Sequence, residues 1–277
     1  MKSLFTALLL LAFSQNIYAQ SIPYGNNEKN GNYFDAGNKT RLYYETYGEG
    51  EPVILLHGGV FGYIDELESF ISRLSKEYTV YCLATRGHGK SEIGHEPFTY
   101  KQMADDVYKL IRHLKLDSVI LLGFSDGALS ALKTAAIHPE AVKKVIAIGV
   151  GEIPKGAWKD KYHYSADDLL SRYRSIFSNR LKFMPEPERW DESLQMLNQL
   201  YNNDYMSDET FIKIQCPVLL LNGEDDEYFP IDTVINCYKK IPNADLSIIP
   251  GCSHVVFFCN FPAVWEPVKV FLGMRQK

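Results

Sequence analysis

The side chains best suited to chemistry are a serine, a carboxylate cluster and a histidine that follow one another along the chain. Ser125 lies in the G-x-S-x-G segment at 123–127, the carboxylates lie at 224–226, and His254 follows them. A serine hydroxyl becomes a nucleophile when a histidine takes its proton and a carboxylate orients that histidine. Since each group directly follows an apolar run, their order predicts a Ser-His-Asp triad.

The G-x-S-x-G segment joins an apolar run to a stretch of small residues that is typical of a helix. A sharp strand-to-helix turn of this kind holds the serine in strained backbone angles, and the flanking glycines let neighbouring elements approach closely. The hydroxyl then stands above the sheet at a helix N-terminus, where backbone N–H groups stabilise developing negative charge. An ordinary surface turn is the alternative for so common a pattern, and the strand and helix around Ser125 favour the nucleophile.

A glycine turn after an earlier apolar run supplies the remaining part of such a site. His57 is followed by two glycines and Val60. The N–H of Gly59, or alternatively of Val60, is predicted to form an oxyanion hole with the N–H of Asp126. We expect His57 to make a structural hydrogen bond beneath the turn rather than to act as a second base. Of the seven histidines, His254 alone follows a strand after the acid, which favours it as the base.

The elements that must position these residues alternate along the chain as in an α/β domain with a mostly parallel sheet. Continuous apolar runs predict strands that are buried on both faces. Longer amphipathic stretches between them predict flanking helices. The predicted strands are 41–47, 53–56, 79–83, 119–122, 145–148, 218–221 and 246–249, and the predicted helices are 63–75, 100–114, 127–137, 233–240 and 263–272.

The alternation of strands and helices stops between 151 and 214. This segment shows helical pattern at 166–181 and 188–201 and no convincing strand. It therefore predicts a helical cap inserted between two core segments, 20–150 and 215–277. The cap is rich in aromatic residues, and a small core within the insertion explains some of them. The others are predicted to line an apolar substrate pocket, with Trp158, Phe183 and Trp190 as substrate-binding candidates.

The chain resembles the α/β-hydrolase superfamily from about residue 33 to about residue 271. The resemblance rests on five motifs: H-G-G at 57–59, R-G-H-G-K-S at 86–91, G-F-S-D-G at 123–127, G-E-D-D at 223–226 and G-C-S-H at 251–254. It implies an α/β-hydrolase fold, and it implies an acid three residues after a strand-end glycine, which selects Asp226 over Asp225. Members of the family usually carry an aspartate where this chain has Ala84, so a turn-bracing contact is expected to be lost.

Around the serine the sequence is similar to the biphenyl-hydrolase-like branch, which includes valacyclovir hydrolase. In that branch the aspartate after the nucleophile binds the amino group of the substrate. The resemblance therefore implies that Asp126 favours substrates with a positively charged group. Its alternative role is simpler, because an acidic side chain in the first turn of a helix interacts favourably with the helix dipole. The many lysines and arginines of the insertion would instead favour anionic or neutral substrates.

The N-terminus predicts a signal peptide at 1–19. Lys2 precedes an apolar run at 4–13 that is too short to anchor in a bilayer, and Ala19 provides the small residue that signal peptidase prefers. An N-terminal helix packed on the domain is the alternative, but such a helix shows polar positions at helical period, which this run lacks. We expect export to a periplasm or to the outside of the cell.

Composition argues against several other classes of protein. The 277 residues carry 29 Lys and Arg against 34 Asp and Glu, without the basic run that nucleic-acid binding needs. Residues 84–91 fit a relaxed nucleotide-binding loop, yet the residues after Ser91 break the helix that phosphate binding requires. Cys252, His254 and Cys259 match no common zinc spacing, so neither a metal nor an organic cofactor is expected. The mature chain shows no membrane span, and the five cysteines leave the question of pairing open.

These features predict an exported serine hydrolase that cleaves a carboxylic ester, or a related acyl bond, of a small molecule. The same triad serves lactonases (including those that open ester or lactone antibiotics), proline-iminopeptidase-like aminopeptidases and carbon–carbon bond hydrolases, so these activities are alternatives. A hydrolase fold retained as a binding module is the alternative outside enzymes, and it would require the loss of a triad member. The sequence leaves the oligomeric state open.

Overall fold

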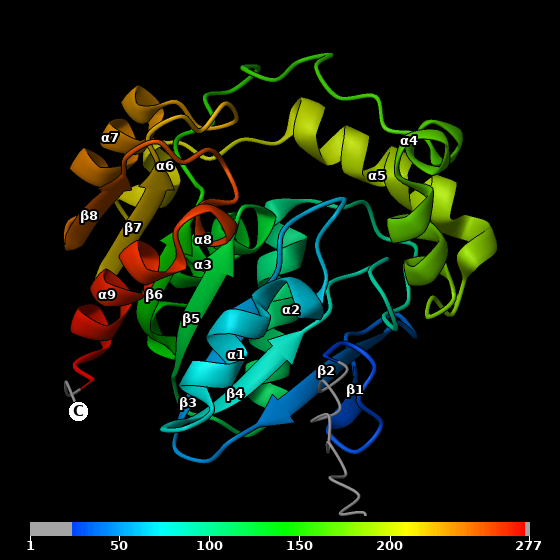
Figure 1. Ribbon diagram of the computed structural model, residues 1–277, viewed down its shortest axis with the longest axis horizontal. Coiled ribbons are helices and arrows are strands. Elements are labelled where there is room, and N and C mark those ends of the chain that lie inside the picture. Colours follow the sequence, from blue (N-terminus) through cyan, green and yellow to red (C-terminus); the bar gives the residue numbers. More distant parts are fainter. Residues whose placement is uncertain (1–23, 275–277) are drawn as a thin grey trace, which may run out of the picture.

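Eight strands form one mostly parallel sheet in the computed structural model, which describes residues 24–274. The predicted signal peptide at 1–19 lies outside the described residues. The strand order is β1-β2-β4-β3-β5-β6-β7-β8, as Figure 1 shows. The strands are β1 (Gly31–Asp35), β2 (Arg41–Tyr47), β3 (Glu51–Leu56), β4 (Tyr78–Leu83), β5 (Val119–Phe124), β6 (Val142–Ile148), β7 (Val218–Gly223) and β8 (Ala244–Ile249).

The direction of the strands divides the sheet into two parts. β1 and β2 pair antiparallel, as do β2 and β4. Every later pair, from β3 with β4 to β7 with β8, runs parallel. The central strands β5 and β7 are buried along their whole length, which explains their continuous apolar sequences. The carboxyl ends of the parallel strands therefore meet at one edge of the sheet, where loops can carry a shared site.

Helices cover both faces of the sheet, and β3 shows how one strand serves both layers. Ile54 and Leu56 join the core beneath α2 (Tyr100–His113) and α3 (Asp126–Ile137). Val53 and Leu55 join the opposite core, beneath α1 (Glu68–Leu74) and α9 (Phe261–Leu272). Two further helices of the core are α7 (Ile231–Lys240) and α8 (Val256–Cys259). The structure thus has the predicted layers of an α/β fold.

Four short elements differ from the sequence prediction. β1 lies in a segment for which the sequence analysis predicts no strand, because this edge strand buries few of its side chains and so lacks an apolar pattern. The predicted helix at 63–75 begins as the 3₁₀ helix η1 (Ile64–Leu67) before α1. The four-residue helices α6 (Asp208–Phe211) and α8 were also missed, since a single turn is too short to show a helical period.

The segment at 151–214 carries helices and lies above the carboxyl ends of the strands (Figure 1). Its main elements are α4 (Ala166–Leu181), the 3₁₀ helix η3 (Pro187–Arg189) and α5 (Trp190–Asn203). α4 is interrupted at Tyr173, whose backbone angles are not helical. A single antiparallel bridge between Ile153 and Met206 joins the two ends of this cap at its base. The cap is therefore attached to the core through two adjacent chain segments.

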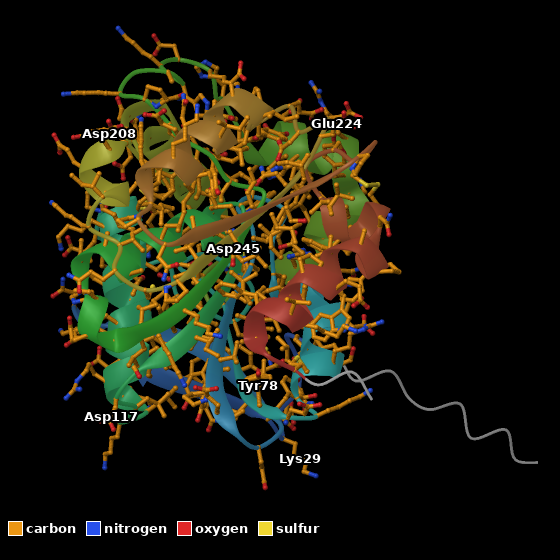
Figure 2. All side chains as sticks on the ribbon, turned by 90° about the vertical axis from the view of Figure 1, so that its left-hand side faces the viewer. Lys29, Tyr78, Asp117, Asp208, Glu224 and Asp245 are labelled. Carbon is orange, nitrogen blue, oxygen red and sulfur yellow. A yellow bond between two sulfur atoms is a disulfide. The ribbon has the colours of Figure 1, made fainter. Side chains whose placement is uncertain are left out.

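Charged side chains of the core project from its outer surface. Figure 2 views the molecule from its β8 edge, with Asp245 of that strand near the centre and Lys29 and Asp117 projecting outward below.

Among residues 24–274, no helix has the length and apolar character needed to cross a bilayer.

Candidate active site

The turn between β5 and α3 holds Ser125 in a strained conformation. Its backbone angles, φ 52° and ψ −117°, lie in a region that residues other than glycine rarely adopt. A Cβ on Gly123 would collide with the carbonyl of Gly127, and one on Gly127 would collide with the carbonyl of Leu56. The sharp strand-to-helix turn predicted from the sequence is therefore confirmed, with both glycines required for close packing.

Ser125, His254 and Asp226 form a continuous hydrogen-bonded chain. The Oγ of Ser125 lies 2.9 Å from Nε2 of His254, and Nδ1 of the same ring lies 2.9 Å from Oδ2 of Asp226. Ser125 follows β5, Asp226 follows β7 and His254 follows β8, so three parallel strands bring them together. The carboxylate requires a proton on Nδ1, which leaves Nε2 as an acceptor toward the serine. This arrangement can remove a proton from the serine hydroxyl.

Asp226 is fixed in place by the turn that it begins. Its side chain is fully buried, and its Oδ1 accepts hydrogen bonds from the N–H groups of Tyr228 (2.9 Å) and Phe229 (3.0 Å). Asp225 is exposed, and its side chain makes no hydrogen bond within the described part of the chain. The turn is capped by the carboxylate of Asp226 itself and not by that of Asp225. The structure brings Asp226, rather than its neighbour, to His254.

The imidazole of His254 is enclosed by aromatic rings. The ring centroids of Phe124 and Tyr228 lie 4.9 Å and 4.7 Å from it. A Cβ on Gly149 would approach the imidazole to 3.1 Å, so only glycine leaves room for the ring at this position. These contacts, together with the two hydrogen bonds, fix the orientation of the ring.

The turn after β3 places backbone N–H groups beside the serine. The N–H of Gly58 donates to the carboxylate of Glu66 (2.8 Å), whereas the N–H of Gly59 has no acceptor among residues 24–274. The N–H of Asp126 lies in the first turn of α3 and has no partner within that helix. Gly59 and Asp126 both line the cavity above Ser125. Their N–H groups are thus available to an oxygen bound there.

His57 supports this turn from below. Its Nδ1 donates to the carbonyl of Gly58 (2.7 Å), and its Nε2 accepts from the N–H of Thr85 (3.1 Å). Burial, with a smaller contribution from nearby His88, holds the pKa of His57 well below its usual range. The ring is therefore neutral and serves as the structural hydrogen-bonding group that we predicted.

A cavity of about 330 Å³ opens above Ser125, between the core and the cap. The core contributes the turn after β3 and the loops that carry Asp226 and His254. The cap contributes aromatic side chains, namely Trp158, Tyr162, Tyr164 and Tyr201. A mostly aromatic wall with a few polar groups suits a small organic molecule better than a polymer.

Comparison with known proteins identifies the family of this fold and site. The profile of the alpha/beta hydrolase fold family matches residues 51–188 and 178–261. The chain belongs to the α/β hydrolase family. It is 26% identical over 231 residues to the serine hydrolase BPHL of Homo sapiens, a match that covers 79% of this chain and 78% of that protein.

Two further similarities extend this comparison. A 2-hydroxy-6-oxo-6-(2'-aminophenyl)hexa-2,4-dienoic acid hydrolase of Metapseudomonas resinovorans is 22% identical over 250 residues, covering 80% of this chain and 83% of that protein. The solved structure of an esterase from Exiguobacterium antarcticum matches with a TM-score of 0.70 and 25% identity, covering 88% of this chain and 99% of that one. These three relatives of the α/β hydrolase are each named as a hydrolase or an esterase.

Two of the predicted pocket residues lie outside the cavity of this α/β hydrolase. Trp158 lines it, but Trp190 is buried against Phe177 in the core of the cap, with ring centroids 5.2 Å apart. Phe183 is partly buried after α4 and does not reach the cavity. Trp190 begins α5, and Tyr201 lies near the other end of that helix, roughly 16 Å further along its axis. The aromatic content of the cap could not reveal which end of the helix faces Ser125.

The carboxylate of Asp126 lies on the cavity wall. Its Oδ2 accepts a hydrogen bond from the hydroxyl of Tyr201 on α5 (2.5 Å), which joins the cap to the residue after the serine. Burial raises the pKa of Asp126 to about 6, although the hydrogen bond from Tyr201 opposes this shift. Oδ1 accepts no hydrogen bond from the described residues and is available to a bound molecule.

Glu66 is a second cavity carboxylate, and the sequence analysis missed it. Its Oε2 accepts the Gly58 N–H, so it braces the turn that presents Gly59. Burial raises its pKa to about 7, and the hydrogen bond from Gly58 opposes that shift. It lies on η1, where an acidic residue in a short polar stretch carries no motif that would have marked it.

The turn after β4 is braced without the aspartate that most family members have. The hydroxyl of Ser91 donates to the carbonyl of Ala84 (2.7 Å), and Arg86 forms a buried bidentate ion pair with Asp106 of α2 (2.7 and 2.9 Å). The expected loss of a bracing contact is thus offset by these bonds. Ser91 does not begin a helix, because the next helix, α2, begins only at Tyr100, so the segment lacks the geometry of a phosphate-binding loop.

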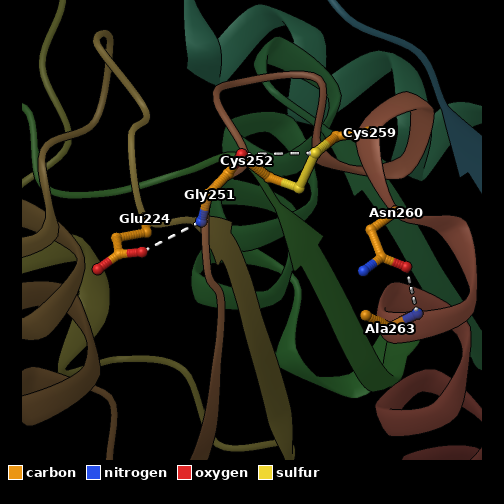
Figure 3. The surroundings of a disulfide bond; sticks show 6 residues. All are labelled: Glu224, Gly251, Cys252, Cys259, Asn260 and Ala263. Carbon is orange, nitrogen blue, oxygen red and sulfur yellow. Dashed lines mark hydrogen bonds between the residues drawn. A yellow bond between two sulfur atoms is a disulfide. The ribbon is translucent and has the colours of Figure 1, made fainter.

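The cysteine residues divide into one pair and three free thiols. Cys252 and Cys259 form a disulfide, shown in Figure 3, whereas Cys82, Cys216 and Cys237 are free. The question of pairing that the sequence left open is therefore answered for all five.

Proposed function

We propose that this α/β hydrolase is a serine hydrolase that cleaves a carboxylic ester, or a related acyl bond, through an acyl-enzyme. The observation that carries the proposal is the hydrogen-bonded chain from Ser125 through His254 to Asp226, with 2.9 Å at each step. The available N–H groups of Gly59 and Asp126 support it, because they can receive the oxyanion that forms beside the serine.

The reaction proceeds in two halves. As Oγ of Ser125 bonds to the carbonyl carbon, Nε2 of His254 takes its proton, and the N–H groups of Gly59 and Asp126 hydrogen-bond to the oxyanion. The histidine then gives the proton to the leaving alcohol, and the carbon–oxygen bond breaks. Water attacks the acyl-enzyme with His254 again as the base, and the acid leaves with Ser125 restored. Asp226 orients the imidazole and stabilises its cation in both halves.

Replacing the serine tests the proposal. Ser125→Ala removes the bond-forming oxygen and is expected to lower turnover of a chromogenic ester by about 10⁴-fold or more. The variant should keep the far-UV circular dichroism of the wild type. An organophosphonate should label Ser125 in the wild type, as peptide mapping would show. Wild-type turnover in Ser125→Ala, or labelling of another serine, would reject the proposal.

A panel of acyl substrates separates the bond types that the same triad can cleave. Esters, lactones, aminoacyl amides and carbon–carbon substrates are compared by kcat/KM. The names of relatives include an esterase and a dienoic acid hydrolase, so both kinds of substrate belong in the panel. We expect the highest value for a carboxylic ester. Binding of all substrates without turnover would favour a binding module.

We further propose that the substrate carries a positively charged group that Asp126 recognises. Three features support this assignment: the carboxylate lines the cavity, one of its oxygens is unpaired within the described chain, and it adjoins Ser125. The resemblance to the biphenyl-hydrolase-like branch points in the same direction. A desolvated hydrogen bond between ammonium and carboxylate contributes about 1.5 to 3 kcal/mol.

We also propose that the protein is exported after cleavage of residues 1–19. The apolar run near the N-terminus supports export, and so does the disulfide, because disulfides persist mainly in oxidising compartments. The mass of the protein purified from a periplasmic or culture-medium fraction tests this proposal. A chain beginning at Gln20 is expected, whereas retention of the full chain in the cytoplasm would reject it.

A further inference from the structure

The loop that carries His254 is closed on itself by a disulfide. Cys252 precedes the histidine by two residues, and Cys259 follows it by five. The loop joins β8 to α9, and the bond spans it as Figure 3 shows. The proposed general base thus lies within a small covalent ring of the chain.

One end of the ring is fixed to the loop that bears Asp226. The carbonyl oxygen of the buried Cys252 accepts a hydrogen bond from the N–H of Asp225 (2.9 Å). Gly223 packs directly against the same carbonyl. The N–H of Gly251 donates to the carboxylate of Glu224 (3.1 Å), which is visible in Figure 3. The position of Cys252 is therefore set by the same strand end that positions the acid.

The other end of the ring is held more weakly. α8 has only four residues, and a helix of that length is not stable by itself. Phe257 packs against Phe124 (4.9 Å between centroids), but Cys259 at the end of α8 is exposed. The next residue, Asn260, already caps α9 by accepting the N–H of Ala263 (3.2 Å). The disulfide is the covalent link from this exposed end back to the fixed Cys252.

We propose that the Cys252–Cys259 disulfide is a positioning element for His254, so that hydrolysis depends on the redox state of this pair. The inference rests on the proposed function, because it assigns His254 the role of base. The disulfide ties the weakly held end of the loop to the fixed Cys252, which limits the conformations of the loop and helps to hold Nε2 at 2.9 Å from Oγ of Ser125. When the link opens, α8 and the loop gain freedom, and the productive geometry is populated less often.

The chemistry of opening is thiol–disulfide exchange with a dithiol reductant. A thiolate of the dithiol attacks the exposed sulfur of Cys259, the sulfur–sulfur bond breaks, and Cys252 leaves as a thiolate that takes up a proton. The second thiol of the reductant then displaces Cys259, so the reductant becomes a disulfide and the protein holds two thiols. Cys82 and Cys237 are buried, which keeps them out of this exchange.

The test compares oxidised and reduced wild-type protein. The protein is treated with dithiothreitol until mass spectrometry after alkylation shows that Cys252 and Cys259 are both thiols. We expect reduction to lower kcat about 10- to 100-fold, since a displacement of about 1 Å at a reacting group has effects up to that size. KM should change less than kcat, because most of the cavity wall, including the aromatic side chains of the cap, lies outside this loop. Reoxidation should restore kcat.

Two variants complete the design. Cys259→Ser cannot form the bond and should show the low kcat with and without dithiothreitol. Cys216→Ser, which removes a free thiol away from the site, should respond to dithiothreitol as the wild type does. The rate at which an organophosphonate labels Ser125 is measured in parallel, because it reports activation of the serine by His254 without a chosen substrate.

An unchanged kcat and an unchanged labelling rate in fully reduced protein would overturn the inference. Loss of activity accompanied by unfolding at the assay temperature, detected by near-UV circular dichroism, would also overturn it, because the disulfide would then stabilise the fold rather than position the base. If the oxidised wild type hydrolyses no ester, the proposed substrate class fails, while the labelling rate still decides the role of the disulfide.

Discussion

At the scale of single residues, two adjacent aspartates have opposite environments. Asp226 is buried and accepts bonds from His254 and two backbone N–H groups, whereas Asp225 is exposed. Only one carboxylate can accept the proton-bearing Nδ1 of the imidazole, so their contributions to catalysis should differ sharply.

Asparagine substitutions at the two positions provide a matched pair. Asp226→Asn should lower kcat by about 10³- to 10⁴-fold, because an amide favours the wrong tautomer of His254. Asp225→Asn should leave kcat within about twofold of the wild type. Steady-state kinetics with one chromogenic ester measures both. A larger defect at position 225 would contradict the assignment of the acid.

Asp126 makes substrate preference depend on pH. With a pKa of about 6, its carboxylate is mostly ionised at pH 7.5 and mostly protonated at pH 5 (about 1.5 and 1 units from the pKa). Only the ionised form attracts an ammonium group. Preference for an aminoacyl ester over its N-acetylated analogue should therefore fall as the pH drops through about 6.

The measurement is the ratio of kcat/KM for the two esters between pH 5 and pH 8. In the wild type the ratio should rise by up to about tenfold with pH, because about a tenth of the carboxylate is already ionised at pH 5, and in Asp126→Asn it should stay flat and low. The asparagine keeps the backbone N–H beside Ser125, so activity toward the acetylated ester should persist. Equal ratios in both proteins would leave Asp126 as a charge at a helix N-terminus.

The burial that raises the pKa of Asp126 also makes the free energy of unfolding depend on pH. Because its pKa is raised in the folded protein, ionisation disfavours folding, and the wild type loses this part of its stability as the pH rises from about 4 through about 6. Asp126→Asn has no such loss. Its free energy of unfolding relative to the wild type should rise by about 1 to 3 kcal/mol between pH 4 and pH 7, as measured by urea denaturation. A constant difference across that range would contradict the raised pKa.

At the scale of elements, the two ends of the cap have different roles. Trp158 lies on the cavity, near Phe229 of the core (5.4 Å between centroids). Trp190 at the start of α5 packs against Phe177 of α4, away from the cavity. One tryptophan lines the cavity above Ser125, and the other packs between the cap helices α4 and α5.

Alanine at these two positions should separate specificity from stability. Trp158→Ala should change the order of kcat/KM across esters of increasing acyl length, because it enlarges the cavity. Trp190→Ala should lower the free energy of unfolding by about 3 to 5 kcal/mol, as loss of a buried aromatic side chain does, and should keep that order. Denaturation curves and the ester panel are measured for both. A changed order in Trp190→Ala alone would reverse the assignment.

At the scale of the whole molecule, a buried carboxylate fastens the first described residues to the sheet. Glu45 of β2 is fully buried. One of its oxygens accepts from the Tyr43 hydroxyl (2.7 Å) and the Asn27 N–H (2.8 Å), and the other accepts from the Tyr47 hydroxyl (2.7 Å) and the Gly25 N–H (2.8 Å). Four donors therefore depend on one side chain far from Ser125.

Glu45→Gln should destabilise the fold without changing the chemistry. The amide nitrogen of the glutamine takes the place of one carboxylate oxygen of Glu45 and cannot accept the two hydrogen bonds that this oxygen accepts. Two buried donors therefore lose their acceptor. We expect the free energy of unfolding to fall by about 3 kcal/mol and kcat to stay within about twofold. Urea denaturation and ester kinetics on the same preparation check both. A fall in kcat without destabilisation would contradict a purely structural role.

The sequence by itself determined the alternation of strands and helices and the strained turn at Ser125, and its resemblance to a known family implied the α/β-hydrolase fold. The first two depend on patterns within a few residues, such as an apolar run, a glycine pair or a helical period, because these patterns set the local conformation of the chain. The sequence analysis missed β1 because an exposed edge strand has no apolar pattern. It missed α6 and α8 because a single helical turn is too short to show a helical period.

Only the tertiary structure decided the distant contacts that no motif marks. The motifs already predicted that Ser125 and His254, which are 129 residues apart, would meet. The bond between Tyr201 and Asp126 and the position of Glu66 beneath the turn after β3 depend on how the cap and η1 pack against the sheet, which local sequence does not show. Phe183 and Trp190 lie outside the pocket for which they were predicted, and Cys252 forms a disulfide with Cys259 that the sequence left open. The direction of a side chain and the path of a loop are set by packing against the rest of the chain.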